Sequence, residues 1–262
     1  MKKIGLGILI GLCVLAVSGV AIAQAARTPA TVVPSGRTVV VPEEAIDNSP
    51  VLEKAIFIHY RKGFAKPPWA GGGAKGPKCY DLLGKGVEWK SLPVSYFIDP
   101  DNQNGLTEAF ITGAVYAGAE GWDEHTSTEL FGTYSVDYSS SWDSDAPDGR
   151  NELLFGDYPQ EGVIAVTVVW GYFSGPPGTR KIVEFDILFD TDFTWGDANV
   201  DPAVMDLQNI ATHELGHGAG LDDVYETVCS EVTMYGYSDY GETKKRTLEP
   251  ADISGIRELY GE

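Results

Sequence analysis

Two histidines separated by three residues lie late in the chain, in the run His213-Glu214-Leu215-Gly216-His217. Residues four apart share one face of a helix, so both imidazoles can reach one metal ion. Glu214 then lies beside the ion, where a carboxylate can accept a proton from a metal-bound water. The alternative is two surface histidines on a helix. That alternative requires a chance match to a pattern expected in about one chain of this length in a hundred.

The residues after this pair predict a third ligand. Gly220 can take a positive φ, which ends the helix and lets the chain fold back. Asp223 can then bring a carboxylate to the metal. Two histidines and a carboxylate, with the fourth position open to water, are typical of one catalytic zinc ion.

Three helices are predicted to frame these residues. The helix that carries the histidines is expected to open at Asp201-Pro202, because proline fits the first helical turn. An amphipathic helix is predicted over residues 107–124, with Thr107 as its N-cap. A short third helix runs from Pro250 to about residue 259 and ends at Gly261.

Short alternating or apolar runs between turn residues predict strands. They cover residues 93–98, 152–155, 163–170 and 182–189. Along the chain the order is strand, helix, several strands, helix, irregular segment, helix. This order predicts an α+β protein.

The first 25 residues have the layout of a secretory signal peptide. Lys2 and Lys3 precede an apolar stretch that ends in Ala21-Ile22-Ala23. A membrane anchor is the alternative, but the small-residue end and the absence of a second apolar span favour cleavage. We therefore expect a secreted, extracellular protein without stable membrane association after cleavage.

Residues 26–78 differ in composition from the rest of the chain. They contain seven prolines, and residues 70–76 are almost all Gly and Ala. Only residues 51–64 look structured, with apolar side chains able to lie against another surface. The segment is predicted to be a propeptide or a flexible N-terminal spacer.

The formal net charge is −19, and the acidic excess is spread along the chain. Nucleic acid and anionic membranes are therefore not expected partners. We expect a monomer that acts on polypeptides.

The zinc motif resembles the metzincins, whose signature H-E-x-x-H-x-x-G-x-x-H ends in Asp in the snapalysin branch, as it does here. The resemblance to matrixins extends further. Residues 182–195 (IVEFDILFDTDFTW) resemble the strand and acidic loop before the zinc helix, residues 232–235 (VTMY) the Met-turn, and residues 248–261 the closing helix. Together these motifs cover roughly residues 80–262.

This resemblance implies the zincin/metzincin fold for residues 79–262. The fold is a mixed twisted β-sheet with a long N-terminal helix, a zinc-binding active-site helix, a Met-turn and a C-terminal helix. It implies a zinc endopeptidase with Glu214 as general base and Met234 as a hydrophobic support beneath the ligands. A peptide substrate would add as a strand along the sheet edge, at Val163, Ile164, Ala165 and Val166.

Two other functions compete with this prediction. A catalytically idle zinc-binding module for surface or matrix interaction could keep the fold, but it would not need an acid such as Glu214 beside an open metal position. A thermolysin-like enzyme would need a later helix carrying an Asn-Glu pair. No such helix follows, and Gly220 and Asp223 fit the metzincin pattern.

The sequence also departs from the matrixin pattern. Residues 156–162 form a short loop without histidine, so the second, structural zinc of matrixins is not expected. Asp190 and Asp192 keep part of a calcium-binding loop, but Phe193 stands where the family has a glutamate. His59 and His125 are assigned no role.

After the signal peptide, Cys79 and Cys229 remain. In an oxidising compartment two thiols pair by default, and the resemblance to snapalysins places a disulfide cysteine near Cys229. The alternative is a matrixin-type cysteine switch at Pro77-Lys78-Cys79, in which a propeptide thiolate occupies the open zinc position. The residues after Cys79 do not match that switch motif, so the disulfide is favoured.

Overall fold

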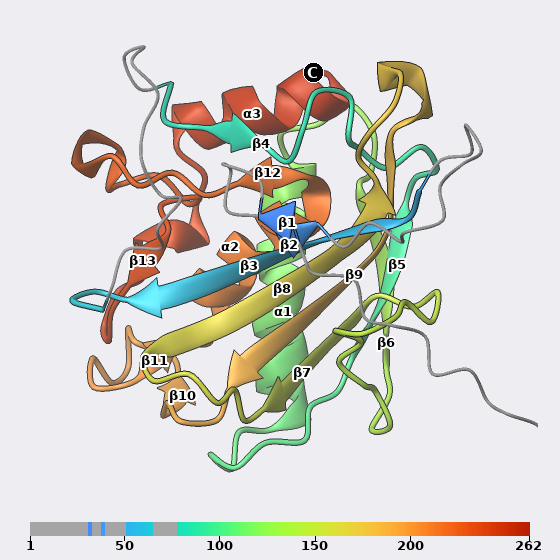
Figure 1. The fold of residues 1–262 in the computed structure, drawn as a ribbon. Helices are drawn as coiled ribbons and strands as arrows, with labels where there is room; N and C mark the ends of the chain where they lie inside the picture. The colour runs from blue at the N-terminus through green and yellow to red at the C-terminus, as the bar shows by residue number, and fades with distance from the viewer. Residues whose placement is uncertain (1–30, 33–37, 40–50, 65–77) are drawn as a thin grey trace, which may run out of the picture.

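The computed structural model describes residues 31–32, 38–39, 51–64 and 78–262, which form a mixed α+β fold around one seven-stranded sheet (Figure 1). The predicted α+β class is confirmed. The helices are α1 (Glu108–Asp123), α2 (Leu207–Ala219) and α3 (Pro250–Tyr260). The predicted signal peptide, residues 1–25, and most of residues 26–78 lie outside the described residues.

The central sheet has the strand order β13-β3-β8-β9-β7-β5-β6. Strands β9, β7, β5 and β6 are mutually parallel, whereas β8 runs antiparallel to both of its neighbours. Strand β13 pairs with β3 in parallel. The strands are β3 (Glu53–Arg61), β5 (Val94–Ile98), β6 (Phe131–Val136), β7 (Glu152–Gly156), β8 (Val163–Tyr172), β9 (Lys181–Asp190) and β13 (Tyr237–Ser238).

Three two-stranded pairs and three short 3₁₀ turns complete the described structure. The pairs join β1 (Thr31–Val32) to β2 (Thr38–Val39), β10 (Trp195–Gly196) to β11 (Met205–Asp206), and β4 (Asp81–Leu82) to β12 (Leu221–Asp222). The turns are Pro177–Thr179, Thr227–Cys229 and Lys244–Arg246. Among the described residues, no helix has both the length and the apolar composition needed to cross a membrane.

Helices α1 and α2 lie behind the sheet as it is seen in Figure 1, and the apolar core fills the space between these layers. The two helices approach closely at Gly118, where an added Cβ would lie 3.0 Å from the backbone nitrogen of Thr212. The indole of Trp122 donates to the carbonyl of Thr212 at 2.8 Å. This contact fixes α1 against the helix that carries the histidines.

The predicted start of that helix at Asp201-Pro202 is wrong, because α2 begins at Leu207. The buried Asp206 carboxylate accepts from the backbone of Asn209 at 2.8 Å and so acts as the N-cap. Pro202 lies instead in the turn before β11. The fixed φ of proline suits a turn as well as a first helical turn, so its position did not distinguish the two.

The other two helices lie close to their predicted ranges. Helix α1 follows Thr107, whose side chain accepts from the backbone of Phe110 at 3.2 Å. Helix α3 begins at Pro250 and is followed by Gly261.

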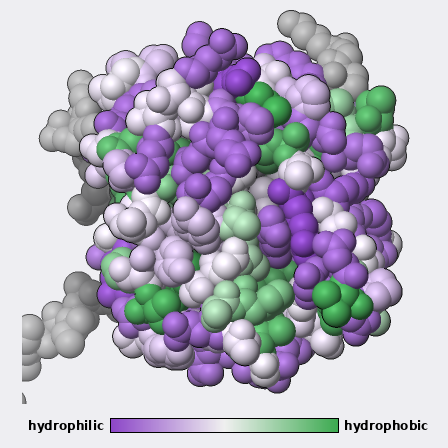
Figure 2. Space-filling view, turned by 180° about the vertical axis from the view of Figure 1, so that it is seen from behind, coloured by the Kyte–Doolittle hydropathy of each residue, from purple (hydrophilic) through white to green (hydrophobic). Residues whose placement is uncertain are grey.

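The surface on the side opposite to the view of Figure 1 is mostly hydrophilic, with small, separate hydrophobic areas (Figure 2). This agrees with a chain that carries a net charge of −19.

Candidate metal centre

Helix α2 and the turn after it bring His213, His217 and Asp223 together. Gly220 follows α2 in the left-handed region, with φ 106°, and the chain then turns back through β12. As a result the Asp223 carboxylate lies near both rings. Its Oδ1 atom is 3.3 Å from Nε2 of His213 and 3.6 Å from Nε2 of His217.

The orientation of both imidazoles is set by backbone carbonyls. Nδ1 of His213 lies 2.7 Å from the carbonyl oxygen of Thr233, and Nδ1 of His217 lies 3.1 Å from that of Leu221. A carbonyl oxygen only accepts hydrogen bonds, so each Nδ1 carries the hydrogen. Each Nε2 therefore presents its lone pair to the space that the two rings share with Asp223.

These three residues fit a zinc ion. Among the described residues, Nε2 of both histidines and Oδ1 of Asp223 are buried without a hydrogen-bond partner. Two ligand atoms of a tetrahedral zinc site lie about 3.3 Å apart. The distances from Oδ1 of Asp223 to the two Nε2 atoms are close to this value. Burial lowers the pKa of His213 to about 3, so its ring is in the neutral form that binds metals.

Glu214 lies beside these ligands and is fully buried. Burial raises the pKa of its carboxyl group to about 7. The hydroxyl of Thr167 donates to Oε2 at 2.5 Å, and Nδ1 of His59 lies 2.9 Å from Oε1. A carboxyl group with this pKa can take up and release a proton near neutral pH.

Comparison with known families covers the part of the chain that holds these ligands. Residues 171–261 match the family model described as Matrixin. The chain is matrixin-like. This likeness supports a metalloprotease.

Individual relatives match over a similar length. Matrix metalloproteinase-16 from rat, human and mouse is in each case 33% identical over 90 residues, which is 34% of this chain. That stretch covers 14% of each relative, so the chain spans only a small part of their length.

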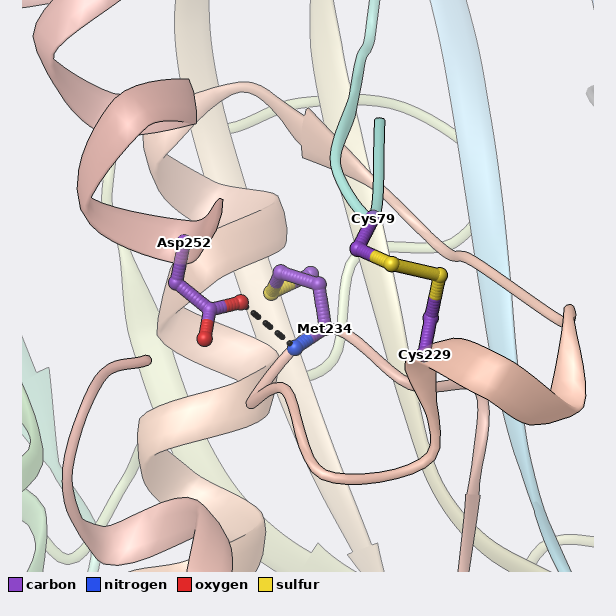
Figure 3. Close-up of a disulfide and its surroundings, with 4 residues drawn as sticks. All are labelled: Cys79, Cys229, Met234 and Asp252. Carbon is purple, nitrogen blue, oxygen red and sulfur yellow. Dashed lines mark hydrogen bonds between the residues drawn. A yellow bond between two sulfur atoms is a disulfide. The ribbon is translucent and has the colours of Figure 1, made fainter. Parts of the chain in front are cut away.

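The matrixin-like segment includes Met234, which packs against α2. A Cβ added to Gly216, between the two histidines, would lie 2.4 Å from the Met234 sulfur. The Asp252 carboxylate accepts from the backbone of Thr233 at 2.9 Å. It also accepts from the backbone of Met234 at 3.1 Å (Figure 3). Helix α3 therefore anchors the turn whose Thr233 carbonyl orients His213.

Cys79 and Cys229 form a disulfide that joins residues 150 apart (Figure 3). The predicted pairing is confirmed, and Cys79 is therefore not a cysteine switch in this structure. The bond acts with the β4–β12 pairing, in which Leu82 opposes Leu221. Both contacts tie the first residues after the Gly-rich segment to the chain that follows the histidine helix.

The structure brings two residues to the site that the sequence did not predict. His59 was assigned no role, and this was wrong, because strand β3 carries it to Glu214. Thr167 was read only as part of a strand. In the strand VIAVTVVWGY, Thr167 is the one residue before Tyr172 that carries a hydroxyl group. A polar residue within an otherwise apolar strand was the signal that could have indicated its role.

The predicted substrate edge, Val163 to Val166, lies in β8 but pairs with β3 of the same chain. Ile58 opposes Val166 and His59 opposes Ala165. The sequence predicted that the apolar side chains of residues 51–64 lie against another part of the protein. In the structure β3, within this segment, pairs with β8.

Asp190 and Asp192 lie with Asp157 in one acidic group whose ligand atoms are within 4.8 Å of one another. Asp190 accepts from the backbone of Asp192 at 3.0 Å, so the group is also a hydrogen-bonded loop. Exposed acidic groups of this kind are common without an ion. Calcium is not supported here.

Proposed function

We propose that this chain is a secreted, zinc-dependent endopeptidase with Glu214 as its general base. The observation that carries the proposal is the convergence of His213, His217 and Asp223 on one point with Glu214 beside them. All four side chains come from α2 and the turn after it, so a short segment builds the whole centre.

Different residues of the chain have different roles in the proposed reaction. When bound, zinc supplies a Lewis acid that polarises the scissile carbonyl and lowers the pKa of water. Glu214 accepts the proton of the attacking water and delivers it to the leaving amine. Thr167 holds Oε2 of Glu214, and the Thr233 and Leu221 carbonyls keep the histidine rings aligned.

The substrate is an extended polypeptide. Strand β8 now pairs with β3 along Val163 to Val166, next to Glu214, and once β3 is displaced it would offer these backbone hydrogen bonds to a substrate. A peptide added there as a further strand gains affinity mainly from its backbone and little from its sequence. The chain is expected to act as an extracellular monomer.

The other function to test is a catalytically idle zinc-binding module. A site that only binds zinc for stability closes its coordination shell with protein ligands. Here the acid Glu214 is held in place next to three ligands by Thr167, which favours catalysis.

The test is hydrolysis of casein by the purified chain, with and without a zinc chelator. It is run on the intact chain and on chain that has been cut between residues 64 and 79 and freed of the N-terminal fragment. We expect about one zinc per chain, loss of hydrolysis on zinc removal and recovery on zinc addition. Full hydrolysis after verified removal of zinc would contradict the proposal.

A further inference from the structure

Strand β3 occupies the place in the sheet that a bound peptide would need. It pairs antiparallel with β8 on one side and parallel with β13 on the other (Figure 1). At its end, the backbone N–H of Arg61 donates to Gly162, and just beyond it that of Lys62 donates to Ser238, each at 2.9 Å. Both neighbouring strands belong to the part of the chain after Cys79.

One face of β3 covers the candidate metal centre. Alternate residues Ala55, Phe57 and His59 are buried. The ring of Phe57 stacks on His217 with centroids 3.9 Å apart and planes 9° apart. The ring of His59 lies on His213, also with centroids 3.9 Å apart. The strand therefore contacts both histidine ligands.

His59 also engages the catalytic acid. Its Nδ1 lies 2.9 Å from Oε1 of Glu214, whose other oxygen accepts from Thr167. Both carboxylate oxygens thus have partners within the protein. His59 therefore competes with a water molecule for Oε1, the carboxylate oxygen that does not accept from Thr167.

We propose that residues 53–61 of the chain itself occupy the peptide-binding position and so keep the protease latent, and that His59 keeps Glu214 from acting as a base by binding its carboxylate. This inference rests on the proposed function. A substrate paired with β8 at Ala165 and Val166 would need the hydrogen bonds that β3 now makes there. Peptide binding and β3 are therefore mutually exclusive.

The covalent connections allow β3 to be separated from the rest of the chain. Cys79 is tied to Cys229, but β3 ends at Arg61, before the Gly- and Ala-rich residues 70–76. A cut between residues 64 and 79 leaves the disulfide intact and leaves β3 held by non-covalent contacts alone.

The first experiment tests latency. Residues 71–74 are replaced by the recognition sequence of a site-specific protease, in a chain that begins after residue 25. The kcat/KM for a fluorogenic peptide is measured before cleavage, and again after cleavage and dialysis in mild denaturant followed by its removal. We expect an increase of about 100-fold or more, because occupancy of the site by β3 costs this factor when it is favoured by about 2.7 kcal/mol. An unchanged kcat/KM would overturn the proposal.

The second experiment measures occupancy without using activity. A labelled peptide of residues 51–64 is titrated with the cut, zinc-loaded chain after its own β3 fragment has been dialysed away, and binding is followed by fluorescence anisotropy. We expect His59→Ala in the peptide to weaken binding about tenfold or more, as for a lost hydrogen bond to a charged group. The control is Lys62→Ala, since Lys62 is exposed beyond the strand, and it should change binding by less than about threefold. Equal affinities for the wild-type and His59→Ala peptides would contradict the role of His59.

The two experiments separate this inference from the proposed function. If the cut chain binds the peptide through His59 but hydrolyses nothing, the proposed function fails while the occupancy stands. If the uncut chain hydrolyses as fast as the cut chain, latency is excluded and the proposed function stands.

Discussion

Nδ1 of His213 lies 2.7 Å from the carbonyl oxygen of Thr233, the residue directly before Met234. The turn that packs against α2 therefore also orients His213, one of the candidate metal ligands. Asp252 holds the backbone of both turn residues from helix α3. Metal affinity should consequently depend on a residue that does not touch the metal ligands.

Asp252→Asn should weaken zinc binding about tenfold or more, because the carboxylate accepts from two backbone N–H groups of the turn through its two oxygens, and the NH₂ nitrogen that replaces one oxygen cannot accept. The zinc affinity is measured by competition with a chelator of known affinity. Glu258→Gln is the matched control, since it changes an exposed carboxylate on the same helix and keeps an acceptor for the Tyr80 hydroxyl. Equal losses in the two variants would contradict the supporting role of Asp252.

Asp223→Ala should weaken zinc binding about 100-fold or more, whereas Asp222→Ala should have a smaller effect. The reason is that Asp223 Oδ1 faces both histidine Nε2 atoms, while Asp222 Oδ1 accepts from the backbone of Asp223. Metal content after dialysis checks the order. The reverse order would show that the third ligand has been misassigned.

The disulfide closes a long loop, so its removal should destabilise the protein. Cys79→Ser combined with Cys229→Ser should lower the free energy of unfolding by about 3 to 5 kcal/mol, measured by urea denaturation. Thiol titration of the denatured, non-reduced wild-type chain after residue 25 should find no free thiol. Two free thiols together with activation by a mercurial would instead indicate a cysteine switch.

Stability should fall as the pH rises through the range near neutrality, because two buried acids prefer to be protonated. Burial raises the pKa of Asp186 to about 8 and that of Glu184 to about 7. Each folded-state pKa exceeds the unfolded value of about 4, so the folded state binds more protons between these values. Stability from these groups is complete below about pH 4 and is lost as the pH rises through about 7 to 8.

Thermal unfolding at pH 5 and pH 8.5 checks this dependence. Asp186→Asn should show a smaller decrease in Tm between the two pH values than the wild type, because it removes one of the two acids. Asp145→Asn is the control, since Asp145 is exposed, and should leave the decrease unchanged. An identical decrease in all three proteins would exclude Asp186 as its source.

The sequence predicted that His213 and His217 lie on one face of a helix that ends at Gly220, because a helix fixes the relation between residues four apart and a glycine with positive φ commonly follows a helix. It also predicted strands β5, β7, β8 and β9 to within a few residues, since apolar runs mark buried strands. It could not predict the partner of β3. Pairing between residues about 100 positions apart depends on tertiary packing, and a single histidine in an alternating strand carries no local signal.

The most direct test of the central claim is Glu214→Gln in the chain cut between residues 64 and 79 and freed of the fragment that carries β3. Glutamine keeps an oxygen for the Thr167 hydroxyl but cannot accept the proton. We expect the variant to retain about one zinc per chain while its kcat/KM for a peptide falls by about 1000-fold or more. Full zinc content together with a kcat/KM within about tenfold of the wild type would contradict the assignment of Glu214 as the general base.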